Sequence, residues 1–110
     1  MTSQGINWTN GEQKIARRAL DAALVTALAD LIADFKRRAA AVTEASEMWQ
    51  IEIWLREQRK HIDYIFDYRY SQMHLVFARL IHDGLMEEYA LSGLSDEHLT
   101  EIRKIRSIWQ

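Results

Sequence analysis

The chain has 110 residues, a formal net charge of −2, no Cys, no Pro and only four Gly. The absence of Cys excludes disulfides, thiolate nucleophiles and zinc or iron–sulfur sites built on Cys. Residues 12 to 83 contain neither Gly nor Pro, although ordinary usage would place roughly eight of them in a stretch of that length. Since β-rich and turn-rich folds need these residues in their loops, we expect a single all-α domain.

The charge balance and the apolar segments exclude two further classes of protein. Fourteen basic residues stand against sixteen acidic ones, whereas a nucleic-acid-binding protein normally gathers positive charge. The longest uncharged apolar run within the helical stretch, residues 22–29, is far shorter than the ~18 residues of a membrane span. The first residues resemble no secretory signal. We therefore expect a cytoplasmic protein without a membrane span.

The first predicted helix covers about residues 10 to 42. Thr9 and Glu12 have the spacing of a capping box, which marks a helix start. Apolar residues then recur along one side up to Val42. A helix of about 33 residues is roughly 50 Å long, whereas a compact domain of this size is about 35 Å across. We therefore predict a homodimer, whose interface lies on this side and contains Leu24, Leu28, Leu31, Ile32 and Phe35.

Three shorter segments complete the expected fold. Thr43 and Ser46 are candidate N-caps for a second helix that ends near Asp67. A third apolar stripe begins at Tyr70, and Gly84 stands where a left-handed residue would end that helix. Residues 86–91 predict a helical turn at most, and Ser95 caps a last helix whose inner face contains Leu99, Ile102, Ile105 and Trp109.

A search for catalytic chemistry finds no constellation. None of the four histidines has an acidic residue three positions before it, which a helical di-iron site would require. Glu57 and His61 could meet on one helix face, but a lone pair of this kind is more often a surface hydrogen bond than half of a metal site. We expect no enzyme activity, no metal and no cofactor.

The second helix carries apolar residues on two sides. Trp49 and Ile53 lie opposite its main apolar stripe, on the side that also carries Arg56. Because aromatic residues and Arg are enriched at the energetic centres of interfaces, this side predicts a protein-binding patch. Burial against the long helix of a dimer partner explains the pattern equally well. Leu75 on the third helix presents the same ambiguity.

Residues 49–84 also resemble a known family. Trp49, Leu55, the run Arg59-Lys60-His61-Ile62-Asp63, the run Asp67-Tyr68-Arg69-Tyr70-Ser71, and later Val76-Phe77, Leu80 and Gly84-Leu85 resemble the fluorescence recovery protein family of cyanobacterial photoprotection. The likeness extends from Trp8 to the last helix. It implies an all-helical homodimer, with a stem over about residues 10–67 and a small head over about 68–110.

The resemblance also implies a function. Members of this family bind the C-terminal domain of the photoactivated orange carotenoid protein, speed its return to the dark-adapted form, and carry no cofactor. Such a protein acts by binding better to states on the return path than to the open state.

The family's functional residues are matched only in part. The family's Trp on the second helix corresponds to Trp49, and its functional Arg corresponds to Arg59. The family's His-Asp pair falls on Glu52 and Ile53, its head aromatic falls on Leu75, and a late basic residue falls on Glu101. Two hypotheses follow: a regulator of an orange carotenoid protein, with contacts from Trp49, Glu52, Ile53, Arg56, Arg59 and Leu75, or a dimeric adaptor for an unrelated partner.

Overall fold

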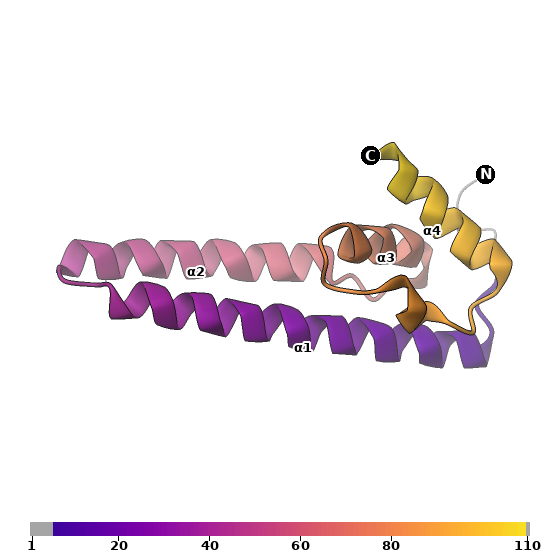
Figure 1. The fold of residues 1–110 in the computed structure, drawn as a ribbon, viewed down its shortest axis with the longest axis horizontal. Coiled ribbons are helices and arrows are strands. Elements are labelled where there is room, and N and C mark those ends of the chain that lie inside the picture. The colour runs from indigo at the N-terminus through magenta and orange to yellow at the C-terminus, as the bar shows by residue number, and fades with distance from the viewer. Residues whose placement is uncertain (1–5, 110) are drawn as a thin grey trace.

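The protein is a long helical hairpin with a small group of helices at one end. The computed structural model describes residues 6–109. Helices α1 (Asn10–Ala40) and α2 (Ala45–Ile65) form the hairpin, here called the stem. The head comprises η2 (Tyr70–Gln72), α3 (Met73–His82), η3 (Glu88–Leu91) and α4 (Asp96–Ile108). Figure 1 shows α1 and α2 side by side, with the head against the N-terminal part of α1.

Helix α1 begins where the capping box predicts. The Thr9 amide donates to Glu12 Oε1 at 3.0 Å, and the Glu12 amide donates to Thr9 Oγ1 at 3.2 Å. The helix ends at Ala40, two residues before the expected end. The predicted capping box is confirmed, and the small difference at the other end is usual for helix boundaries.

The break between the two stem helices corrects one expectation. The N-cap of α2 is Glu44, not Thr43 or Ser46. The Glu47 carboxylate reaches back and accepts hydrogen bonds from the Thr43 amide, the Thr43 hydroxyl and the Glu44 amide, at 2.9 to 3.0 Å. These bonds, those from Thr43 foremost, lower the pKa of Glu47. One acidic side chain therefore satisfies the donors of the turn, so the Thr43 hydroxyl donates instead of capping.

Helix α2 ends at Ile65, two residues earlier than expected. The Asp67 carboxylate accepts from the Arg69 amide and from the Arg69 guanidinium, at 2.6 to 3.1 Å. This local pairing holds residues 67–69 in an extended connection and lowers the pKa of Asp67. The chain then turns into η2 and α3.

Gly84 ends α3 as predicted. The Leu85 amide donates to the Leu80 carbonyl at 2.9 Å, and the Gly84 amide donates to the Ile81 carbonyl at 3.1 Å. Gly84 has a φ of 79°, the left-handed conformation that this Schellman motif requires. Ser95 caps α4, also as predicted, because its Oγ accepts from the His98 amide at 3.4 Å.

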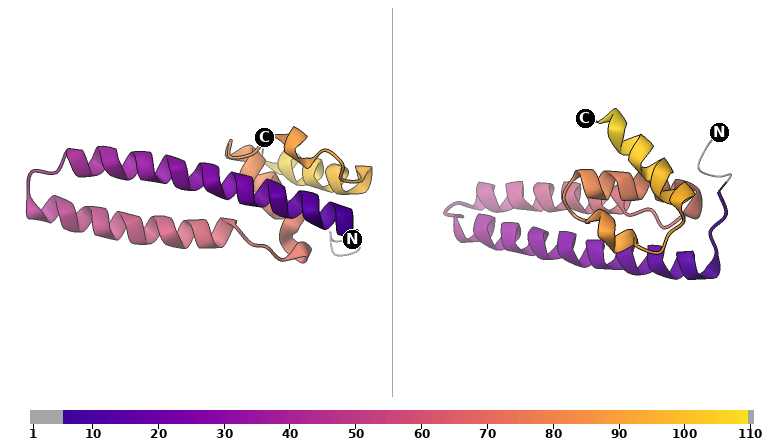
Figure 2. Two further views of the ribbon diagram at one scale, coloured as in Figure 1. Left: turned by 90° about the horizontal axis from the view of Figure 1, so that it is seen from below. Right: turned by 45° about the vertical axis from the view of Figure 1, so that its right-hand side comes forward.

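The buried core lies in the head and against the first half of α1. Leu20, Phe77, Leu80 and Leu91 are fully buried. Beyond Ala27, no described residue of α1 is buried, and Ile65 is the one buried residue of α2. The molecule therefore measures 53 × 24 × 22 Å, with much of the stem outside any core. Figure 2 shows the free end of the hairpin projecting from the head. None of the helices within residues 6–109 is long and apolar enough to cross a membrane.

Candidate protein-interaction surface

The two sides of α2 have different environments. Ile51, Leu55 and Ile62 are half-buried on the side that faces α1. Trp49 and Ile53 point away from this side, and their exposed fractions are 58% and 45%. Within one chain, the main apolar stripe of α2 thus meets α1, and the second apolar side remains open to solvent.

Trp54 belongs to the inner side, although it was not assigned to a face from the sequence. The guanidinium of Arg38 on α1 lies 4.2 Å from the centre of the Trp54 ring. A cation over an indole face is a favourable contact, so this pair joins the two helices near the hairpin turn. Trp54 lies three residues after Ile51 and four before Gln58. These spacings match the helical period, so Trp54 belongs to the side of α2 that faces α1.

The open side of α2 forms the α2 patch, made up of Trp49, Glu52, Ile53, Arg56 and Arg59. All are exposed. Arg56 Nη2 and Glu52 Oε1 are 3.5 Å apart, one helical turn from each other. Arg59 follows Trp49 by ten residues, a rotation of about 80° and a rise of about 15 Å along the helix. A large apolar surface beside a weakly paired Arg is the composition of a protein-binding site.

Leu75 does not join the α2 patch within one chain. It lies half-buried on α3 in the head. Trp49 lies near the start of α2, and the remaining helix to Ile65 spans about 24 Å. A partner that touches both Trp49 and Leu75 of one chain would have to extend along most of α2.

A second exposed apolar surface, the α1 stripe, consists of Val25, Leu28, Ile32 and Phe35, with exposed fractions of 69%, 40%, 54% and 38%. Their spacings of three, four and three residues match the a and d positions of a coiled coil. Leu28, Ile32 and Phe35 were expected from the sequence. Leu24 and Leu31, also expected, are half-buried in their own chain. Val25 was missed, although its place seven residues before Ile32 signals the repeat.

The head contains a buried polar cluster that sequence reasoning also missed. His74 on α3 and His98 on α4 are fully buried, and His74 Nε2 lies 2.7 Å from His98 Nδ1. The Trp8 ring stacks on the His98 ring at a centroid distance of 3.9 Å. Glu12 on α1 closes the cluster, since its Oε2 accepts from the Ser95 amide at 2.9 Å. His74 and His98 are 24 positions apart in the chain, and Asn7 and His98 are 91 positions apart. No local sequence pattern therefore predicts the cluster.

The hydrogen bonds of this cluster assign its protons. His98 Nε2 donates to the Asn7 carbonyl at 3.0 Å, because a carbonyl can only accept. In a neutral His98, Nδ1 then accepts from His74 Nε2–H. The remaining His74 Nδ1 is buried without a partner within residues 6–109. Burial first, and then electrostatic repulsion between the two imidazoles when both are protonated, lower the pKa of His74 to about 4.

Glu12 is held in its charged form. Burial acts to raise its pKa, but hydrogen bonds from the Thr9 and Ser95 amides, the Thr9 side chain and attraction to His98 outweigh burial and lower the pKa to about 2. Across residues 6–109, no group of His, Asp or Glu has the arrangement of a metal site. The hydrogen bonds of the cluster join α3 to α4 and connect α1 to the start of α4.

The fold and these surfaces define a helical protein with a packed head and an open, partly apolar stem. The family model "Photoprotection regulator fluorescence recovery protein" matches residues 8–106. The chain belongs to this family of non-enzymatic photoprotection regulators.

Individual relatives agree with this assignment. The chain is 26% identical to the fluorescence recovery protein of Synechocystis sp. (strain ATCC 27184 / PCC 6803 / Kazusa) over 98 residues, which cover 89% of this chain and 90% of the relative. The solved structure of the Fremyella diplosiphon fluorescence recovery protein superposes with a TM-score of 0.86 at 32% identity, covering 92% of this chain and 99% of that one. The Synechocystis structure gives the same TM-score and coverage at 26% identity.

Proposed function

We propose that the chain binds the C-terminal domain of a photoactivated orange carotenoid protein and accelerates its return to the dark-adapted form. The carrying observation is the exposure of Trp49 on the open side of α2, at the position where the family has its functional Trp. Arg59, the match of the family's functional Arg, is exposed on the same helix. The α2 patch is then the contact surface, and the protein needs no cofactor because it only favours states on the return path.

We further propose that the active form is a homodimer joined through the α1 stripe. Four large apolar side chains with a coiled-coil repeat are open to solvent in the single chain. Leu24 and Leu31 flank the stripe and are half-buried, so they would be the edge of the interface. A two-fold axis brings the same stripe of a second copy into contact, which makes the interface self-complementary. Such pairing would leave the α2 patch free for the carotenoid protein.

The experiment that tests the proposed function mixes the purified chain with a light-activated orange carotenoid protein and follows the loss of the activated colour in the dark. We expect faster recovery in proportion to added protein. Trp49→Ala should reduce the acceleration at least about tenfold, since it removes the largest side chain of the patch. The matched control is Tyr89→Ala, which removes an aromatic side chain that is 77% exposed in the head. Unchanged recovery at excess protein contradicts the proposal.

The second candidate is an adaptor that uses the same dimer for an unrelated protein partner. The Glu52–Arg56 ion pair and the exposed Ile53 favour it, because these residues replace the His-Asp pair expected for the family and change the rim of the patch. Rim charges mainly set partner choice and association rate. A stable dimer that leaves carotenoid recovery unchanged would select this candidate. Recovery restored in the double variant Glu52→His, Ile53→Asp would show that the rim alone decides the partner.

A further inference from the structure

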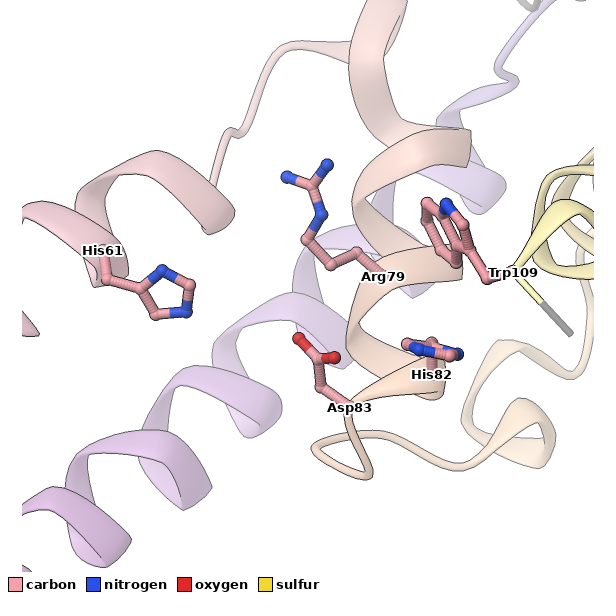
Figure 3. A pocket seen from close by; sticks show the side chains of 5 residues that line it. All are labelled: His61, Arg79, His82, Asp83 and Trp109. Atoms are coloured by element: carbon pink, nitrogen blue, oxygen red, sulfur yellow. The ribbon is translucent and has the colours of Figure 1, made fainter.

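A cleft of about 470 Å³ lies where the stem meets the head, and nothing above assigns it a role. Figure 3 shows its five lining side chains around a common gap: His61 from α2, Arg79 and His82 from α3, Asp83 after α3, and Trp109 after α4. Its volume is within the range of ligand-binding clefts. Since three separate segments supply the lining, the cleft exists only in the folded chain.

The lining is rich in hydrogen-bond donors. Arg79 carries five N–H groups, Trp109 carries one, and each neutral imidazole carries one, whereas Asp83 supplies the one carboxylate. Trp109 is half-buried, and its ring lies 5.3 Å from that of His82, so one wall is aromatic. A ligand that fits must therefore offer acceptors to the donors and an apolar part to the ring.

The charged groups of the cleft are available. Within residues 6–109, neither Arg79 nor Asp83 has an ion-pair partner, whereas the guanidinium groups of Arg103 and Arg106 both pair with Glu88. Arg79 is half-buried, and its guanidinium lies over the Tyr64 ring, 5.1 Å from the centroid. Asp83 stands at the negative end of α3, where a carboxylate is unfavourable. The Arg79 guanidinium can therefore pair with a carboxylate supplied by a ligand.

We propose that this cleft binds an acidic side chain, Asp or Glu, of a protein partner. The ligand carboxylate pairs with the planar fork of Arg79, the arrangement that makes Arg–carboxylate bonds strong and directional. The apolar part of the acidic segment lies on Trp109, and Asp83 accepts a backbone N–H of the same segment. The inference deepens the proposed function and rests on it only in taking the ligand to be a protein.

Tyr64 relates the position of the cleft to that of the α2 patch. Tyr64, which Arg79 covers, lies on the same side of α2 as Trp49 and Ile53. It follows Trp49 by fifteen residues, a distance of about 22 Å along the helix. A partner that lies along the open side of α2 from Trp49 therefore reaches the cleft. The acidic anchor would fix the register of that partner, while Trp49 supplies the apolar contact.

The test is a titration of the full-length, ¹⁵N-labelled chain with the blocked tripeptide acetyl-Leu-Glu-Leu-amide, followed by NMR. We expect saturable shifts of the Trp109 indole N–H and the Arg79 Nε–H, with a dissociation constant on the order of 1 mM. The uncharged acetyl-Leu-Gln-Leu-amide should bind at least about tenfold more weakly. Arg79→Gln should weaken binding of the acidic peptide by a similar factor. Arg18→Gln, which changes an exposed Arg on α1, should leave it unchanged.

Several outcomes would overturn the inference. Equal binding of the two peptides would show that the carboxylate is not recognised, and binding that survives both Arg79→Gln and Trp109→Phe would place the peptide elsewhere. Inorganic phosphate that moves the same two resonances with equal affinity would make the cleft a general anion site instead of a protein site. Absence of saturable shifts also overturns it. The peptide assay contains no carotenoid protein. A negative peptide result would therefore contradict the cleft proposal without bearing on the recovery assay that tests the proposed function.

Discussion

The head and the stem of this protein bury their apolar residues in opposite ways. In the head, Phe77 and Leu80 are fully buried, and three helices share one core. In the free part of the stem, Ile32 on α1 and Trp49 on α2 are more than half exposed. Both regions consist of regular helices, so helix formation alone does not explain the difference. A two-helix hairpin has too few layers to cover all of its apolar residues, so some of them remain open to solvent in the single chain.

The largest expected effect is on the stem. Ile32→Glu should dissociate the proposed dimer, because each copy would bury an unpaired charge, at about 3–5 kcal/mol per site. Sedimentation should show a dissociation constant raised at least about a hundredfold. Circular dichroism should still show a folded, helical chain, since Ile32 is 54% exposed in the single chain. The control is Ala33→Glu, at an exposed position off the stripe. An Ile32→Glu protein that remains fully dimeric contradicts the assigned interface.

A core substitution in the head should also have a large effect, but its dependence on protein concentration should differ from that of a stem substitution. Phe77→Ala should destabilise the fold by about 3–5 kcal/mol, because it leaves a cavity in the core. Urea unfolding should show this loss at every protein concentration. Phe35→Ala on the stem should instead show a loss that grows with protein concentration, because the proposed dimer would bury a side chain that is exposed in the single chain. If both variants behave alike at all concentrations, the distinction between the two regions is wrong.

The buried histidine cluster makes the stability of the head depend on pH. The pKa of His74 in the folded chain is about 4, below its usual 6.5. The unfolded chain therefore binds a proton that the folded chain does not, and stability falls as pH decreases from about 6.5 to 4. The loss should reach up to about 3 kcal/mol. Glu12, with its pKa lowered to about 2 from 4.5, extends the loss to lower pH with the same sign.

The free energy of unfolding, measured against pH by urea titration, checks this dependence. His74→Gln keeps a donor for His98 Nδ1 and removes the titration, so the slope between pH 6.5 and 4 should flatten. His82→Gln, at an exposed position of the same helix, should retain the slope. A slope unaffected by His74→Gln would show that another group titrates in this range.

The smallest expected effect concerns two glycines. Gly84→Ala should destabilise the head by about 1 kcal/mol, because Gly84 has a φ of 79° and a Cβ there meets no atom within 4 Å. The penalty is thus purely one of backbone conformation. Gly11→Ala lies in the first turn of α1, also in open space, and should raise stability by up to about 1 kcal/mol. Thermal unfolding should therefore shift in opposite directions for the two variants.

The local features of the fold were predictable because each depends on neighbours in the sequence. The Thr9–Glu12 box, the Gly84 stop and the Ser95 cap all involve residues within a few positions, and all three formed as expected. The turn at residues 41–44 was less predictable, since Thr43 and Ser46 were both candidate N-caps and the helix begins after Glu44 instead. The start of α2 depended on the Glu47 carboxylate, which accepts hydrogen bonds from the Thr43 and Glu44 amides.

The candidate site was predictable in composition but not in arrangement. The sequence placed Trp49 and Ile53 together on one side of α2, because both follow the helical period. It left open whether that side is buried, and the structure shows it exposed in the single chain. Trp54, by contrast, needed its contact with Arg38 to be assigned to the inner side. Leu75 shares no helix with Trp49, so their separation depends on how the head joins the stem.

The sequence by itself determined that this protein is all-helical, where α1 and α4 are capped, and that the first helix is longer than a compact domain of this size. These properties follow from periodicity, capping and the absence of helix breakers between residues 12 and 83. Only the tertiary structure decided which side of α2 meets α1, that His74 and His98 form a hydrogen bond in the head, and that Arg79, Asp83 and Trp109 line one cleft. Such contacts join residues far apart in the chain, and a helical period carries no information about which distant surface will cover it.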